Sequence, residues 1–149
     1  MRIEIDQSGK IENTSKHTYL AFSNSQHFVL EIKATEKRKL QKYFRSIGKS
    51  RIFIYLTFAA LLIILLKNRK IKTAQLIVDI EYQGRTQLIK DSLHAINPDF
   101  PVKNLSFHHI GKKSSAHYYA YGAAIGSIKS DLKVGASEIF RTIKKPGSA

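Results

Sequence analysis

The residues of this sequence best suited to chemistry are carboxylates that close apolar segments. Asp6 closes the alternating segment RIEID and is followed by Gln-Ser-Gly, and Asp79 and Glu81 close the apolar run in LIVDIEY. If that strand continues, Asp79 and Glu81 project to the same face, because they are two residues apart. A carboxylate among Leu, Ile and Val is costly to bury unless it binds a cation. With Asp6 on a neighbouring strand, the acids predict a pocket for hard divalent ions such as Mg²⁺.

Two such ions about 4 Å apart would activate water and stabilise the leaving oxygen in phosphodiester cleavage. Simpler interpretations are open: Asp6 as a turn residue and Asp79 as the salt-bridge partner of a Lys or Arg. His117 opens a helix after the segment IGKKSSA, where a role at the site and a packing or surface role are both open. His108 and His109 are adjacent on a strand, so only one can face the site, and we expect neither to be essential.

The charge balance indicates a polyanionic partner. The 149 residues include 25 Lys and Arg against 11 Asp and Glu, a formal net charge of +14, and no cysteine. This charge favours nucleic acid over an acidic membrane, and the lack of cysteine excludes a disulfide scaffold, a Cys zinc site and a thiol nucleophile. Residues 67–72 form a second basic segment. A solvated helix face is the alternative for the basic run 33–51, but its one-sided charge predicts phosphate contacts by Lys37, Arg38, Lys42, Arg45, Lys49 and Arg51, joined by Lys112 and Lys113 from a later loop.

The elements that must position these residues follow from hydrophobic periodicity. Three short strands joined by turns predict an antiparallel meander, after which helices and strands alternate, so we expect an α/β fold with a mixed sheet covered by helices. We expect one domain over 1–145 and a disordered tail over 146–149. The expected strands are 2–6, 18–23, 28–32, 74–80 and around 105–109; the expected helices are 35–47, 52–66, 86–96 and 115–125, with a short strand at Val134 and a helix within 136–143 as possible additions.

The apolar run 52–66 raises the question of a membrane. It has 15 residues, fewer than the roughly 20 that a spanning helix needs, and basic residues lie on both sides. We therefore predict a buried core helix and no membrane partner, with a single membrane anchor as the alternative. The N-terminus lacks the apolar core of a signal peptide, and together with the lack of cysteine this predicts a cytoplasmic protein.

Four segments, in order, resemble the ribonuclease H-like superfamily, and type 1 ribonuclease H most of all: IEIDQSGKIE, FAALLIILLK, LIVDIEY and FHHIGKKSSAHYYA. The resemblance implies a mixed five-stranded sheet, a three-strand meander followed by β-α-β-α. It implies that Asp6 and Asp79 are metal ligands and that His117 stands where the family has an acid. The family's core helix supplies a Glu that the matching stretch Tyr55–Thr57 lacks, and Glu81 could replace it.

The resemblance implies an Mg²⁺- or Mn²⁺-dependent endonuclease with a two-metal mechanism. In that mechanism Asp6 bridges both ions, Asp79 and Glu81 complete one, and His117 holds or orients the other. The expected substrate is the RNA strand of an RNA–DNA hybrid. One alternative is a structure-selective DNA endonuclease of the Holliday-junction resolvase type, and another is a nucleic-acid-binding module without activity, because the helix Glu is missing. The sequence does not predict the oligomeric state.

Overall fold

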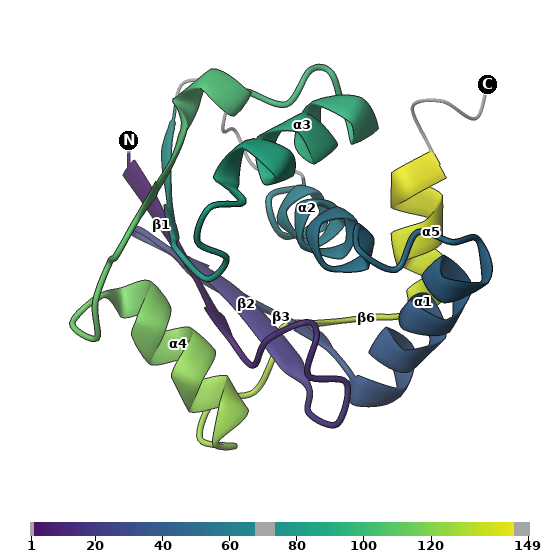
Figure 1. Ribbon diagram of the computed structural model, residues 1–149. Helices are drawn as coiled ribbons and strands as arrows, with labels where there is room; N and C mark the ends of the chain where they lie inside the picture. Colours follow the sequence, from purple (N-terminus) through teal and green to yellow (C-terminus); the bar gives the residue numbers. More distant parts are fainter. Residues whose placement is uncertain (1, 68–73, 145–149) are drawn as a thin grey trace.

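A six-stranded mixed sheet organises the protein, as the computed structural model, which describes residues 2–67 and 74–144, shows (Figure 1). The strand order is β5-β4-β1-β2-β3-β6, and β2 is antiparallel to both of its neighbours while the other pairs are parallel. The predicted α/β class and N-terminal meander are therefore confirmed. The strands are β1 Arg2–Ser8, β2 Thr18–Ser23, β3 His27–Ile32, β4 Gln75–Asp79, β5 Leu105–His108 and β6 Leu132–Val134.

The sheet has one strand more than the five of the implied layout, and this strand, β6, is the short strand expected at Val134 as a possible addition. Strand β6 is three residues long, too short to display an alternating pattern, and it exists because it pairs in parallel with β3. Asp131 fixes its start, since its N–H donates to the Val29 carbonyl while its carboxylate accepts from the Val29 N–H, both at 2.8 Å. The position of the strand in the sheet is therefore specified by a contact across more than 100 positions of the chain, which local periodicity cannot reveal.

Of the five α-helices in the described residues, four lie on one face of the sheet (Figure 1). The helices are α1 Ala34–Ser46, α2 Phe53–Leu65, α3 Thr86–Ile96, α4 Ser115–Ala124 and α5 Ala136–Lys144, with a short 3₁₀ helix at Val102–Asn104. Figure 1 shows α1, α2, α3 and α5 on one side and α4 alone on the other. The large core lies between the sheet and α2, where Ile3 and Ile5 of β1 pack with Phe58, Leu61 and other apolar residues of the helix.

The predicted core helix is confirmed as α2, which is buried along most of its surface. Its 13 residues span about 20 Å at 1.5 Å per residue, against about 30 Å for the apolar part of a bilayer. Throughout the described part of the chain, no helix is long and apolar enough to cross a membrane.

The opposite face of the sheet packs on α4 through small side chains. Ala21 of β2 and Val29 of β3 are buried against Ala120 and Ala123 of the helix. Small residues at both sides of this contact let the helix lie close to the strands. Because side chains alternate along β1, Ile3 and Ile5 face α2, and Glu4 and Asp6 face the α4 side.

The carboxyl ends of the neighbouring strands β1 and β4 lie side by side at the same end of the sheet. From β1 the chain turns to β2 on one side, and from β4 it passes through α3 to β5 on the other side. Such a switch point is where open α/β sheets bind ligands. Gly9 makes the turn after β1 possible: its φ is +82°, and a Cβ there would collide with the His17 carbonyl. The predicted tail 146–149 and most of the basic segment 67–72 lie outside the described residues.

Candidate active site

Three carboxylates lie close together at the carboxyl ends of the adjacent strands β1 and β4. Asp6 lies on β1, Asp79 is the last residue of β4, and Glu81 follows two residues later. One ligand oxygen from each lies within 4.8 Å of the others. The parallel register explains the first pair, because Ile5 is opposite Val78 and the next residues along the two strands are the two aspartates. The structure therefore brings together the three acids that the sequence singled out.

Glu81 reaches this group by a different route from the one the sequence predicted. The strand does not continue to Glu81 but ends at Asp79, so the expected alternation does not place the Glu81 side chain. The Ile80 N–H still donates to the His108 carbonyl at 3.1 Å, after which the chain bends at Glu81. The bend after β4, rather than strand periodicity, carries the third carboxylate to the site.

The negative charges of the three acids repel one another. Burial raises the pKa of Asp6, which is 4% exposed, and the charge of Asp79 raises it further, against the lowering effect of hydrogen bonds with Gln7 and His117. Burial raises the pKa of Glu81 to about 7, and the charges of Asp6 and Asp79 add to this. Within the described residues, no Lys or Arg forms a salt bridge with any of the three acids. The site thus concentrates negative charge that a bound cation would relieve.

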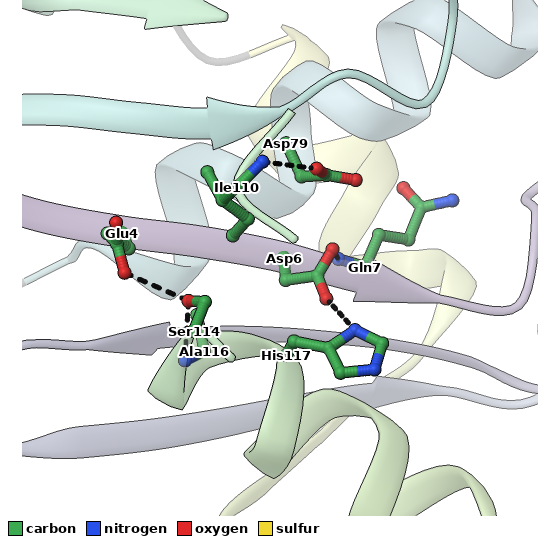
Figure 2. Close-up of polar contacts among 8 residues, drawn as sticks. All are labelled: Glu4, Asp6, Gln7, Asp79, Ile110, Ser114, Ala116 and His117. Carbon is green, nitrogen blue, oxygen red and sulfur yellow. Dashed lines mark hydrogen bonds and ion pairs between the residues drawn. The ribbon is translucent and has the colours of Figure 1, made fainter. Parts of the chain in front are cut away.

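Backbone hydrogen bonds fix the two aspartates. The Gln7 N–H donates to Asp6 Oδ1 at 2.9 Å, and the Ile110 N–H donates to Asp79 Oδ1 at 3.0 Å (Figure 2). Each carboxylate is thereby held in one orientation before any ligand arrives. The alternative that Asp79 serves as the partner of a Lys or Arg finds no such partner in the part of the chain that the structure describes.

His117 contacts Asp6 directly. Its Nδ1 lies 2.8 Å from Asp6 Oδ2, and Figure 2 shows the other ring nitrogen pointing away from Asp6. The imidazole is stacked parallel to the Tyr121 ring one turn later on α4, with ring centroids 5.8 Å apart. His117 is not part of the three-acid group. The structure places it beside the acids, as a hydrogen-bond partner of Asp6.

Two residues that the sequence analysis did not single out hold His117 in place. Ser114 caps α4, its Oγ accepting from the Ala116 N–H at 3.2 Å and donating to the Glu4 carboxylate at 2.9 Å. Glu4 lies on β1 two residues before Asp6 and on the same face. The first turn of α4 is therefore attached to the strand that carries Asp6. Two features of the sequence could have indicated this contact: Ser114 directly precedes the helix, and Glu4 lies two residues before Asp6 on the same strand.

The two adjacent histidines lie at the rim of the site. His108 is the last residue of β5 and is opposite Asp79 in the parallel register, so both side chains leave the sheet on the same face. His109 follows the strand, and both histidines are exposed. No hydrogen bond or ion pair connects the side chain of either histidine to the three acids.

Comparison with known proteins assigns this chain to no family. No family model, curated protein or solved structure matches it. The ribonuclease H-like resemblance and the nuclease function therefore stay predictions. Their support comes from the contacts of the three acids and from the surface around them.

One of the predicted phosphate contacts is wrong. Lys37 is fully buried, and its Nζ donates to the Lys10 carbonyl at 3.1 Å, the Asn13 carbonyl at 2.7 Å and Thr18 Oγ1 at 2.9 Å. Burial lowers the pKa of Lys37 to about 8. Its side chain ties α1 to the loop between β1 and β2 and cannot reach a phosphate at the surface. The basic face of the predicted helix suggested that Lys37 is at the surface, whereas the structure buries it.

The other predicted contacts are exposed. Arg38 donates to the Thr14 carbonyl at 2.7 Å and keeps an exposed side chain. Strand β3 runs parallel to β1, so α1, which follows β3, begins at the edge of the sheet where Asp6 lies. The exposed residues are Arg38, Lys42, Arg45, Lys49, Arg51, Lys112 and Lys113, and their contact with nucleic acid stays a prediction.

Substitution of two lysines on α1 should have separate effects, one on the stability of the fold and the other on nucleic-acid binding. We expect Lys37→Ala to lower the free energy of unfolding by about 2 kcal/mol, because it leaves buried carbonyls without a donor. Lys42→Ala should leave stability within about 0.5 kcal/mol of the wild type but reduce the salt dependence of nucleic-acid binding by about one unit of slope. Urea denaturation and binding at several salt concentrations measure the two effects. The reverse pattern would contradict the assignment of Lys37 to the interior.

Proposed function

We propose that this protein is a divalent-metal-dependent nuclease. The observation that carries the proposal is the meeting of Asp6, Asp79 and Glu81 within 4.8 Å at the carboxyl ends of two adjacent parallel strands. Hard oxygen ligands of this kind suit Mg²⁺ and Mn²⁺, which are held by carboxylates together with water and substrate phosphate. The net charge of +14 supports a polyanionic substrate.

The fold supports the ribonuclease H-like interpretation. The first five strands follow the implied layout, a three-strand meander and then β4, α3 and β5, with α4 after them. Strand β6 and helix α5 are additions at the far edge of the sheet, away from β4 and β5. Asp6, Asp79 and His117 lie on β1, β4 and α4, the elements that the resemblance assigns to metal binding.

The three acids fit a metal site by their chemistry. The ionised forms of Asp6 and Glu81 are disfavoured by burial and by the charges of the neighbouring acids, and no described Lys or Arg forms a salt bridge with any of the three. Asp6, Asp79 and Glu81 would hold the ions, which supply an activated water and stabilise the leaving oxygen when bound. Glu81 takes the place of the missing helix Glu in this proposal.

The remaining residues of the site orient the acids. The backbone N–H groups of Gln7 and Ile110 each hold one oxygen of an aspartate, so these carboxylates need little rearrangement to bind a cation. His117 holds the other oxygen of Asp6 and leaves its second ring nitrogen available at the rim, where it can exchange a proton with substrate or water. Glu4 and Ser114 position His117 through the start of α4.

The favoured substrate is the RNA strand of an RNA–DNA hybrid, which the closest resemblance implies. A structure-selective DNA endonuclease is the alternative that shares the same acids. A binding module without activity is favoured by the absence of the helix Glu, because the Tyr55–Thr57 stretch offers no carboxylate. A cytoplasmic location is part of the proposal and rests on the cysteine-free sequence.

One panel of substrates tests the proposal. The wild-type protein is incubated with a hybrid, a duplex, a single strand and a four-way junction, each with Mg²⁺, Mn²⁺ or EDTA. We expect metal-dependent products from the RNA strand of the hybrid and none in EDTA. Cleavage of the junction alone would favour the resolvase type, whereas salt-sensitive binding with no product would favour the binding module.

A further inference from the structure

The outer face of α4 carries large side chains that are more than half exposed. Tyr118, Tyr121 and Ile125 are 64%, 52% and 61% exposed and are spaced at i, i+3 and i+7, so they form one continuous strip. The opposite face of the same helix, with Ala120 and Ala123, packs on the sheet. We call this strip, Tyr118, Tyr121 and Ile125, the aromatic face. Exposed rings gathered in this way mark a binding surface.

The aromatic face continues into the candidate active site. The Tyr121 ring is parallel to the His117 ring, with an angle of 8° between the planes, and His117 contacts Asp6. Tyr121, on the exposed surface of α4, is thus connected to the Asp6 carboxylate through the His117 side chain. Lys112 and Lys113 are exposed in the loop that precedes the helix. The basic side chains thus immediately precede the helix that carries the exposed rings.

We propose that the aromatic face binds unpaired nucleotides, whose bases stack on Tyr118 and Tyr121 while Lys112 and Lys113 contact the phosphates. This inference rests on the proposed function, because it names the form of the substrate at the same site. Within a duplex the faces of the bases are covered by their neighbours, so only a single strand or a splayed junction can offer them to a tyrosine ring. The substrate would then be a hybrid or a junction that carries unpaired nucleotides beside the bond that is cut.

The charge of the surroundings selects this occupant over an apolar one. An apolar protein or a second copy of this chain would have to approach a strip bordered by two lysines on a chain with net charge +14, and two such copies would repel each other. A single-stranded nucleic acid satisfies both features, since its bases match the rings and its phosphates match the lysines. Ile125, at the end of the strip, would contact the edge of a base or a sugar.

Binding in EDTA tests the inference without cleavage. A fluorescently labelled oligo-dT of about 15 nucleotides and a blunt duplex of the same length are titrated with the full-length protein and its variants. We expect Tyr118→Ala to weaken oligo-dT binding about 5- to 100-fold and to leave duplex binding unchanged. Tyr118→Phe should bind like the wild type, because it keeps the ring. Leu88→Ala removes an exposed apolar side chain from α3, on the other face of the sheet (Figure 1), and is the matched control, with thermal melting to verify folding.

The outcomes separate this inference from the proposed function. Unchanged oligo-dT binding by Tyr118→Ala and Tyr121→Ala would overturn the inference, even if the substrate panel shows cleavage. Loss of oligo-dT binding with no cleavage of any substrate would support the aromatic face and reject the nuclease. If Tyr118→Ala loses binding to anionic vesicles but keeps oligo-dT binding, the face is a lipid surface and the inference is wrong.

Discussion

Asp6→Asn is expected to abolish metal-dependent cleavage while leaving the metal-free protein at least as stable as the wild type. Asp6 offers an oxygen within 4.8 Å of ligand oxygens of both Asp79 and Glu81. A bound ion contributes several kcal/mol of charge stabilisation to the transition state, and each 1.36 kcal/mol is a factor of ten in rate. Loss of a ligand shared by the proposed ions should therefore lower the cleavage rate by about a thousandfold.

Stability should change in the opposite direction. The Asn side chain keeps an oxygen that can accept from the Gln7 N–H, as Asp6 does at 2.9 Å. It also removes a buried charge whose ionised form the fold disfavours, because burial and Asp79 both raise the pKa of Asp6. The free energy of unfolding in EDTA should thus stay equal or rise. Opposite effects on activity and stability are the mark of a residue kept for function.

Cleavage of the preferred substrate and urea denaturation in EDTA measure the two effects. Asp91→Asn is the matched control, since Asp91 is exposed on α3 and contacts only Gln87 among the described residues. This control should match the wild type in both assays. If the Asp6→Asn protein cuts with Mg²⁺ at the wild-type rate, the proposed metal site is wrong. If the variant is strongly destabilised, Asp6 is a structural residue.

The sequence was sufficient where local pattern and burial agree. The apolar run at α2 and the alternation in β1 predicted the core helix and the first strand, and an acid at the end of each apolar strand predicted the pair Asp6 and Asp79. These predictions succeeded because a carboxylate next to a buried strand has few favourable surroundings. The parallel pairing of β1 with β4 then brought the two acids together.

The sequence was insufficient where a residue depends on distant contacts. Lys37 looks like its neighbours on a basic helix, but the loop between β1 and β2 folds over it and supplies two acceptors for its ammonium group, and Thr18 at the start of β2 supplies a third. Strand β6 depends on pairing with β3, and Glu81 reaches the site through a bend. The bond from Ser114 to Glu4 joins positions 110 residues apart. Each of these is decided by tertiary structure, which hydrophobic periodicity does not encode.

Glu81 should make both stability and metal binding depend on pH near neutrality. Its pKa is about 7 in the folded protein and 4.5 in the unfolded chain, so the native state binds the extra proton between these values. The stability this proton contributes is complete below pH 4.5 and is lost as the pH rises through about 7. The full shift corresponds to about 3 kcal/mol, which partial access to water reduces to about 1–2 kcal/mol. Metal-free protein should therefore be less stable at about pH 8 than at about pH 5.

Metal binding should have the opposite pH dependence. A cation needs the ionised carboxylate, so protons and Mg²⁺ compete for Glu81. At limiting Mg²⁺ the cleavage rate should fall about tenfold for each pH unit below 7. Glu81→Gln removes the titrating group, so we expect it to flatten the stability profile of the metal-free protein and to lower cleavage about a hundredfold or more at every pH.

Urea denaturation in EDTA and cleavage at limiting Mg²⁺, each from about pH 5 to about pH 8, measure these effects. Glu138→Gln on α5 changes a carboxylate on the other face of the sheet, so its profiles should follow the wild type. The charge of Asp6 contributes to the raised pKa of Glu81, so Asp6→Asn should flatten part of the stability profile as well. If Glu81→Gln keeps the wild-type stability profile, Glu81 does not titrate in this range and the electrostatic coupling of the three acids is wrong.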